Sequence, residues 1–276
     1  PASEPTDSNF SNLTPPEDDD YVRGDLDSDG IPDIIWQKSG TSDVKFWFMN
    51  TDGSIKDELD LDHGASVDWT VSSMGDMNND GNTDILWQHN DGSTVFCYHM
   101  DGTGKVDSGK SLASGVIPGW RFVSASDFNR DGDVDFLWHS TAQGSTVCWH
   151  FDGEGVVNGF SPLGSGIVDF FISYSGNDMN ADSYSDVIYQ SINSGQVLVW
   201  YFDDKKNILG TKNYIRSMSP VLRVAGAYDY NNDNAVDLLF QNDSTGEAKI
   251  VYFDTSGTQL SEKEIGTIGS NWKIRN

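Results

Sequence analysis

The chain has 276 residues, with 43 Asp plus Glu against 17 Lys plus Arg and a formal net charge of −26. This balance argues against a nucleic-acid-binding protein, which needs basic side chains against phosphate, and against binding to an anionic membrane surface. Because 37% of the residues are hydrophobic and 12% aromatic, the chain can still build a core, so its acidic residues are expected to be concentrated at particular places.

Residues 1–20 differ in composition from the rest of the chain. They are rich in Pro, Ser, Thr and acidic residues, which predicts a disordered linker ahead of a folded domain over residues 21–276. A linker at this place indicates a module of a larger multidomain protein. No run of about 18 apolar residues occurs, so no transmembrane helix and no direct membrane insertion are expected.

From residue 21 onward the sequence repeats every 51 residues, anchored by an Asp at positions 25, 76, 127, 178 and 229. Each repeat reads as a short strand before the anchor, an acidic turn, a second strand such as residues 85–88, a third such as residues 94–100, and a weaker fourth. A repeat of about 40 to 50 residues with four antiparallel strands is typical of a β-propeller blade.

The ends of the chain predict how the ring closes. Residues 272–276 resemble the strand opening at residues 69–71, and residues 21–24 are predicted to continue the same strand. We therefore expect an all-β, five-bladed propeller of four-stranded antiparallel blades, closed by the C-terminal segment joining the N-terminal blade. Closure would remove exposed sheet edges. The alternative is an open fragment of a larger propeller.

The acidic turn after each anchor has the spacing of a metal-binding loop. In its strongest form it is Asp25-Leu26-Asp27-Ser28-Asp29-Gly30-Ile31-Pro32-Asp33. Carboxylates at positions 1, 3, 5 and 9 around a tight turn supply hard oxygen ligands that suit Ca²⁺ better than Mg²⁺. An EF-hand is excluded because it needs Glu at position 12, where this loop has Trp36.

We predict about five Ca²⁺ ions, one in each blade, held by side chains at positions 1, 3, 5 and 9 and by a backbone carbonyl at position 7. Apart from Asp25, Asp27, Asp29, Ile31 and Asp33, these residues are Asp76, Asn78, Asp80, Asn82 and Asp84; Asp127, Asn129, Asp131, Asp133 and Asp135; Asp178, Asn180, Asp182, Tyr184 and Asp186; and Asp229, Asn231, Asp233, Ala235 and Asp237.

The repeated pattern Asp-x-Asp/Asn-x-Asp-Gly-x-x-Asp-Ile/Leu resembles the FG-GAP/VCBS repeats of integrin α-subunit propellers and of many secreted bacterial proteins. The resemblance covers residues 21–276. It implies Ca²⁺ in each loop, a secreted or cell-surface location, and use in adhesion or carbohydrate recognition. Integrin propellers have seven blades, so their partner sites are not transferred. In blade number alone, the ring is similar to tachylectin-type lectins.

An aromatic and a polar residue stand together at the end of each second strand, as in Trp36-Gln37. Sugar sites combine such residues, and repeated weak sites give avidity for a glycan. The aromatic residues either face a ligand or pack between blades. In the second case their polar neighbours are the predicted exposed ligand-binding residues, namely Gln37, Gln88, His139, Gln190 and Gln241.

The sequence therefore predicts multivalent glycan or polysaccharide recognition. One alternative is a protein-binding or structural surface module, which an exposed apolar patch would indicate. A polysaccharide lyase or hydrolase domain is a weaker alternative, because no catalytic signature or asymmetric carboxylate pair can be named and no catalytic residue is assigned.

Three other features are expected to carry no function. Cys97 and Cys148, equivalent in adjacent repeats, are predicted to be buried free thiols. The histidines of the strand columns, at positions 99, 139 and 150, align with aromatic residues or Gln in other repeats, so no zinc site is expected. Residues 104–111 match a phosphate-binding loop letter for letter, but neither a preceding parallel strand nor a following helix is expected there.

Overall fold

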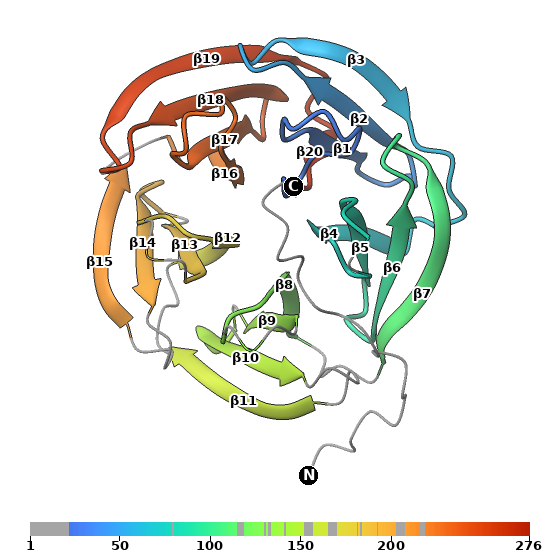
Figure 1. Cartoon of the computed structure of the whole chain (residues 1–276), viewed down its shortest axis with the longest axis horizontal. Coiled ribbons are helices and arrows are strands. Elements are labelled where there is room, and N and C mark those ends of the chain that lie inside the picture. Colours follow the sequence, from blue (N-terminus) through green and yellow to red (C-terminus); the bar gives the residue numbers. More distant parts are fainter. Residues whose placement is uncertain are drawn as a thin grey trace.

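The computed structural model describes residues 22–276 apart from residues 79, 115–118, 130, 132, 133, 141, 152–156, 165–169, 181, 183, 192, 203–207 and 216–218. The predicted linker at residues 1–20 lies outside the described residues. Within them, twenty strands form five four-stranded antiparallel sheets arranged around a central axis (Figure 1). The predicted β-propeller with four-stranded antiparallel blades is confirmed.

In each sheet the innermost strand lies next to the axis and the last strand forms the outer rim (Figure 1). From the axis outward, the strands of the five sheets are β20 (Trp272–Ile274), β1 (Ile34–Lys38), β2 (Val44–Met49) and β3 (Ile55–Asp60); β4 (Trp69–Gly75), β5 (Asp84–His89), β6 (Thr94–Met100) and β7 (Val106–Ser114); β8 (Arg121–Ser126), β9 (Asp135–Ser140), β10 (Ser145–Phe151) and β11 (Val157–Gly164); β12 (Phe170–Asn177), β13 (Asp186–Ser191), β14 (Val197–Phe202) and β15 (Ile208–Ile215); and β16 (Leu222–Tyr228), β17 (Asp237–Asn242), β18 (Glu247–Phe253) and β19 (Gln259–Thr267).

The two ends of the described chain meet in the first sheet. Strand β20 pairs antiparallel with β1, with Trp272 opposite Lys38, as the repeat register predicts. The side chain of Asn276 extends the ladder, because its Oδ1 accepts the Ile35 N–H at 2.8 Å and its Nδ2 donates to the Asp33 carbonyl at 2.6 Å. The C-terminus therefore lies at the centre of the ring (Figure 1).

The sequence predicts that residues 21–24 continue the strand that the C-terminal segment begins. This prediction is wrong for residues 22–24, which the structure describes. Arg23 and Gly24 form a turn, in which the Asp25 N–H donates to the Val22 carbonyl at 3.1 Å and Gly24 has a φ of 91°. The Gly24 carbonyl, which accepts the Asp33 N–H at 2.8 Å, keeps one strand-like bond. The physical reason is that the Asn276 amide already bonds the backbone of β1 at the position where the strand would continue.

The core lies between neighbouring sheets. Strands β4, β8, β12 and β16 contact one another in turn around the axis. One apolar cluster joins Leu86 of the second sheet to Phe122 of the third. The aromatic residues near the end of each second strand are at most 1% exposed, so they pack in the core: Trp36, Trp87, Trp138, Tyr189 and Phe240. Each buried side chain of this size contributes about 1.5–3 kcal/mol to folding.

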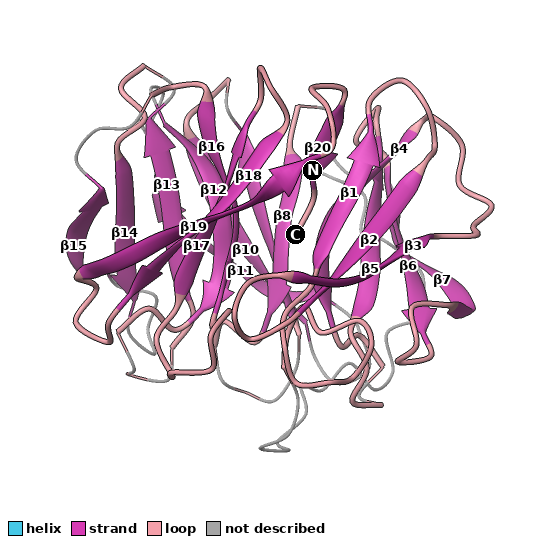
Figure 2. Ribbon diagram, turned by 90° about the horizontal axis from the view of Figure 1, so that it is seen from above, coloured by secondary structure: helices cyan, strands magenta, loops and turns pink. Residues whose placement is uncertain are grey.

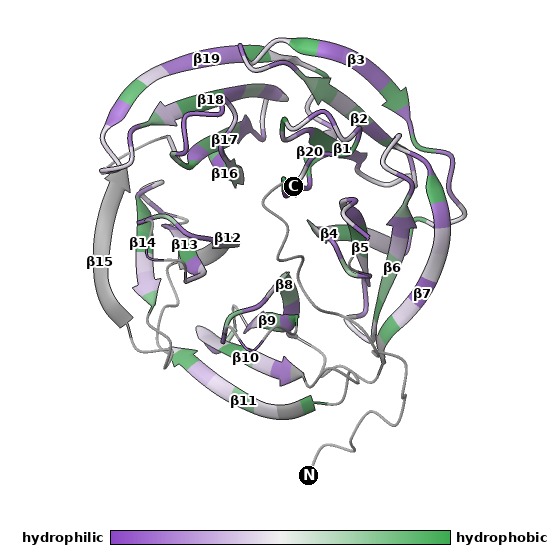
Figure 3. Ribbon diagram, in the orientation of Figure 1, coloured by the Kyte–Doolittle hydropathy of each residue, from purple (hydrophilic) through white to green (hydrophobic). Residues whose placement is uncertain are grey.

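The outer strands β3 and β19 carry many hydrophilic residues (Figure 3). Most residues of β3 and β19 are exposed, and charged side chains are common in both. Charged side chains on an edge strand disfavour pairing with another molecule. These two outer strands are thus protected against edge-to-edge association.

The segment that resembles a phosphate-binding loop is part of a sheet. Residues 106–114 form the outer strand β7, which pairs antiparallel with β6. The expectation that this segment lacks the strand–loop–helix context is confirmed. Among the described residues, no helix is long and apolar enough to cross a membrane.

Candidate metal loops and channel pocket

In four sheets the predicted metal loop joins the innermost strand to the second strand, and in the first sheet the loop directly precedes the second strand, β1, so the loops gather at one end of the ring, here called the acidic end. Strand ends and their loops lie above and below the sheets in Figure 2. Loops one and two touch, since the Ser28 hydroxyl donates to the Asn82 side-chain carbonyl at 3.4 Å. The five predicted sites therefore form a ring of acidic turns.

Each loop is folded around its first Asp. In the first loop, the Asp25 carboxylate accepts the N–H of Asp29 at 3.2 Å and that of Gly30 at 2.6 Å. The Asp29 carboxylate in turn accepts the Ile31 N–H at 3.0 Å. Gly30 has a φ of 87°, a left-handed conformation that glycine adopts without strain. These bonds turn the loop carboxylates toward a common centre.

The other loops repeat this geometry. The first-position carboxylate accepts the fifth-position N–H in loops two to five, at 3.2, 3.2, 3.0 and 3.0 Å. The N–H of Asn82, Tyr184 and Ala235, at position 7, donates to the fifth-position carboxylate. The predicted ligand Asp133 lies outside the described residues.

The ninth-position Asp is the most deeply buried part of each loop. Asp33 is fully buried, and its two oxygens accept the N–H of Leu26 at 2.8 Å and of Met49 at 2.9 Å. This carboxylate thereby ties the loop to the end of the third strand. Burial raises the pKa of Asp33 to about 8 and those of Asp186 and Asp237 to about 7. Each carboxylate keeps further lone pairs that can meet a cation.

Loop one differs from the others at position 3. There the Nζ of Lys56 lies 2.6 Å from a carboxylate oxygen of Asp27 and 2.6 Å from one of Asp29. Oxygens of Asp25, Asp27 and Asp29 lie within 4.8 Å of one another. In the other loops an Asn amide donates to the fifth-position Asp in place of the lysine: Asn78 to Asp80, Asn129 to Asp131, Asn180 to Asp182, and Asn231 to Asp233.

The second and third blades each place an Asp, a Cys and a His within 4.8 Å of one another, a grouping that the sequence analysis did not anticipate. His99 Nδ1 lies 3.0 Å from the Asp84 carboxylate, which raises the pKa of His99. Cys97 is a buried free thiol, as expected, and burial raises its pKa well above the ordinary value. The cluster is therefore an imidazole–carboxylate pair beside a neutral thiol. Asp135, Cys148 and His150 repeat it.

The predicted exposed polar column is buried. Gln37, Gln88, His139, Gln190 and Gln241 are 0–7% exposed, so the expectation of exposure is wrong. The reason is that each glutamine pairs with the innermost strand of the next sheet. Gln190 donates to the Leu222 carbonyl at 2.6 Å and accepts the Val224 N–H at 2.9 Å. We call this pairing the glutamine clamp; it recurs from Gln37 to Trp69 and Val71, from Gln88 to Trp120 and Phe122, and from Gln241 to Trp272 and Ile274.

His139 replaces the glutamine in the third blade. Its Nδ1 lies 3.0 Å from the Thr146 hydroxyl, and burial lowers its pKa. It therefore bonds within its own sheet, because Thr146 belongs to β10. Of the five predicted ligand-binding residues, Gln88 lines the cavity described next.

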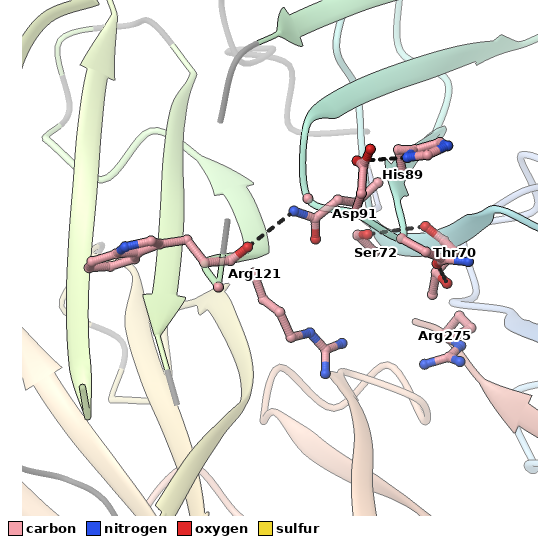
Figure 4. Close-up of a pocket in the computed structure, with 11 residues that line it drawn as sticks. Thr70, Ser72, His89, Asp91, Arg121 and Arg275 are labelled. Atoms are coloured by element: carbon pink, nitrogen blue, oxygen red, sulfur yellow. Dashed lines mark hydrogen bonds and ion pairs between the residues drawn. The ribbon is translucent and has the colours of Figure 1, made fainter. Parts of the chain in front are cut away.

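A cavity of about 440 Å³ lies between the second and third sheets, at the end of the ring opposite the acidic end. We call it the channel pocket. It is bordered by the first residues of β4 and β8, whereas the acidic loops follow the last residues of these strands. Its lining includes Thr70, Ser72, His89, Asp91, Arg121 and Arg275 (Figure 4).

Two arginines of this pocket were missed by the sequence analysis. Arg121 opens β8 and Arg275 follows β20, and their guanidinium groups lie on the same side of the pocket (Figure 4). Burial lowers the pKa of Arg121. Burial, followed by the nearby charges of Arg223 and Arg121, lowers the pKa of Arg275 to about 10. The only sequence signal was the presence of arginine at inner-strand positions of an acidic chain.

Arg223 lies in the same region and, unlike the two pocket arginines, forms an ion pair. It lies 3.4 Å from an Asp243 carboxylate oxygen and donates to Gln241 at 2.9 Å. Among the described residues, no carboxylate forms an ion pair with Arg121 or Arg275, and the buried Nε of Arg275 has no hydrogen-bond partner. The pocket therefore presents two cationic groups that form no ion pair with a described carboxylate, and Asp243 offsets only part of the repulsion on Arg275.

Comparison with known proteins agrees with the repeat pattern. A model of the FG-GAP-like repeat matches residues 25–87 and 76–138. No characterised protein sequence shows significant similarity to the chain.

Solved structures resemble the chain at low sequence identity and with TM-scores below 0.5. A lectin from Agrocybe aegerita that recognises non-reducing terminal N-acetylglucosamine is 16% identical, with a TM-score of 0.47 over 87% of this chain and 69% of that one. Regucalcin from Agrobacterium tumefaciens, a calcium-binding protein, is 11% identical, with a TM-score of 0.49 over 95% and 77%. A periplasmic gluconolactonase from Pseudomonas aeruginosa is 14% identical, with a TM-score of 0.44 over 87% and 69%. Likeness at this level carries no argument about function.

Proposed function

The chain carries FG-GAP-like repeats in a β-propeller, and we propose that it is a secreted or cell-surface, calcium-stabilised module that binds a glycan or polysaccharide. The observation that carries this proposal is the set of acidic loops in register at one end of the ring. The linker composition of residues 1–20 supports its use as one part of a larger protein.

The loops fit Ca²⁺ by the chemistry of their donors. Each offers carboxylate and amide oxygens around one turn, the ligand type that calcium prefers. Burial raises the pKa of Asp25, Asp33 and Asp76, which means that negative charge at these positions is poorly compensated by the protein alone. A bound Ca²⁺ would supply the missing positive charge, so the loops are expected to be more stable with the ion, one per blade and about five in all.

Glycan recognition is favoured by the repeated architecture and by the polar pocket. Similar surfaces recur around the ring, so several weak sites can act together on a repeating polymer. The channel pocket presents hydroxyl groups of Thr70 and Ser72 together with charged groups. Polar side chains of this kind can bond sugar hydroxyls.

A protein-binding module is the alternative, and an exposed apolar patch would favour it. The large apolar side chains exposed in the described part of the chain are Val67, Phe160, Val221 and Leu260. They stand on different strands and loops, Phe160 in β11 and Leu260 in β19. Scattered apolar residues are ordinary on a protein surface, so they give this alternative little support.

Calorimetry of the full chain against a panel of neutral and acidic oligosaccharides tests the proposal. Titrations are made in Ca²⁺, in Mg²⁺ and in chelator. We expect saturable heat in Ca²⁺, with more than one site for a repeating polymer, and its loss in chelator. Silence across the panel, while Ca²⁺ still raises the melting temperature, would contradict glycan binding and turn attention to protein partners.

A further inference from the structure

Positive charge is scarce in this chain, and much of it is paired among the described residues. Lysines 38, 45, 56, 249, 263 and 273 each lie within 4.0 Å of a carboxylate oxygen. With 43 acidic against 17 basic side chains, a carboxylate is available for almost any exposed cation. Two neighbouring arginines that form no such pair in the described structure therefore indicate a site for an anionic ligand.

Arg121 and Arg275 also repel each other. Each guanidinium lies near like charge, and the positive charges of Arg223 and Arg121 both disfavour the charged form of Arg275. Arg121 keeps an exposed surface, whereas Arg275 is half-buried, so Arg275 in particular loses part of its hydration. An anion between the two groups would reverse the balance, since guanidinium binds carboxylate and sulfate oxygens through two parallel N–H bonds.

The remaining pocket groups suit a saccharide. The Thr70 hydroxyl donates to the Asn90 side-chain carbonyl at 2.7 Å, and the Ser72 hydroxyl donates to the Thr70 carbonyl at 3.2 Å. Both hydroxyl oxygens keep acceptor lone pairs for sugar hydroxyls. His89 and Asp91 are paired at 2.7 Å, so this carboxylate is already partnered within the pocket. The cavity of about 440 Å³ is within the range of small-molecule sites.

We propose that the channel pocket binds the anionic group of an acidic saccharide, a carboxylate or a sulfate ester, with Arg121 and Arg275 as its two cationic partners. This inference rests on the proposed glycan-binding function and names the class of glycan. A ligand with one or few anionic groups is favoured over a dense polyanion, because the net charge of −26 repels every negative charge outside the pocket.

Calorimetry on the full chain in Ca²⁺ tests the proposal with matched ligands. The probes are an oligosaccharide with one uronic acid, its neutral methyl ester, the same oligosaccharide with a sulfate ester in place of the carboxylate, and inorganic sulfate alone. We expect the methyl ester to bind about tenfold or more weakly than the acid, since a charge-assisted pair is lost. The acid and the sulfate ester together show which oxyanion is preferred.

Variants connect the effect to the two arginines. Arg121→Gln and Arg275→Gln are each expected to weaken binding of the acid about tenfold or more, with little change for the methyl ester. Lys249→Gln removes a charge that is paired with Glu262 on the rim and serves as the matched control. Melting curves of the three variants verify that each is folded.

The outcomes separate this inference from the proposed function. Equal affinity for the acid and its methyl ester, or unchanged acid binding by both arginine variants, overturns the inference while leaving glycan binding in place. Binding of inorganic sulfate with no binding of either acidic saccharide also overturns it. Silence toward every saccharide, neutral or acidic, overturns the proposed function as well.

Discussion

The two ends of the ring are built in opposite ways. At the acidic end, the same turn occurs once in each blade, with the same internal bonds around Asp25, Asp76, Asp127, Asp178 and Asp229. At the channel pocket the residue types differ between blades, because Arg121 stands at the repeat position that Thr70 occupies in the preceding blade, and the decisive residues are basic. The comparison indicates that the acidic end is shared scaffolding, whereas the opposite end can be specific to this chain.

Removing residues 272–276 should destabilise the protein most strongly, because it abolishes β20 and Arg275 while the sequence of every acidic loop stays unchanged. Backbone groups of β1 and the side chain of Gln241 lose buried partners, each loss costing about 1–3 kcal/mol. We expect loss of a cooperative thermal transition, followed by circular dichroism, with the full-length Arg275→Gln variant melting like the native chain. A truncated chain with the native melting temperature would contradict ring closure by β20.

Removing one glutamine clamp should give the next largest loss of stability. Gln190→Leu leaves the Leu222 carbonyl and the Val224 N–H without their partner and is expected to destabilise the protein by about 2–4 kcal/mol. Denaturant unfolding measures the change. Gln143→Leu, at an exposed position, is the control and should have almost no effect. Equal stability of the two variants would mean that the clamp does not hold neighbouring blades together.

Substituting Lys56 should give the smallest of these effects, a change in the Ca²⁺ affinity of one acidic loop. Its ammonium group already bonds the carboxylates of loop one, so Ca²⁺ must compete with it. Lys56→Gln is expected to raise the Ca²⁺ affinity of that loop about three- to tenfold, since removing a cation at a partly exposed site is worth about 1 kcal/mol. Lys45→Gln, which loses bridges to Glu58 and Asp60 instead, is the control. Weaker binding by Lys56→Gln would contradict competition.

The features that could be predicted from the sequence are those repeated from blade to blade, and the features that could not be predicted depend on how the blades meet. The 51-residue period placed the strands, the four-stranded blades and the acidic turns, because each was seen in several copies in register. The role of the glutamines could not be predicted, since it depends on the distance from one sheet to the next. Arg121 and Arg275 lie far apart in sequence and at different repeat positions, so only closure of the ring brings them together.

The central claim, that Ca²⁺ in the acidic loops stabilises the propeller, is tested by counting bound Ca²⁺ per chain at equilibrium and by melting the same sample with and without chelator. We expect about five ions. Each well-filled site contributes about 4 kcal/mol at a thousandfold excess over its Kd, and each kcal/mol raises Tm by about 2–4 °C in a domain of this size. One filled site alone would account for about 8–16 °C, so the melting temperature should fall by at least about 10 °C in chelator. A chain that binds no Ca²⁺ and melts at the same temperature in both conditions would contradict the account.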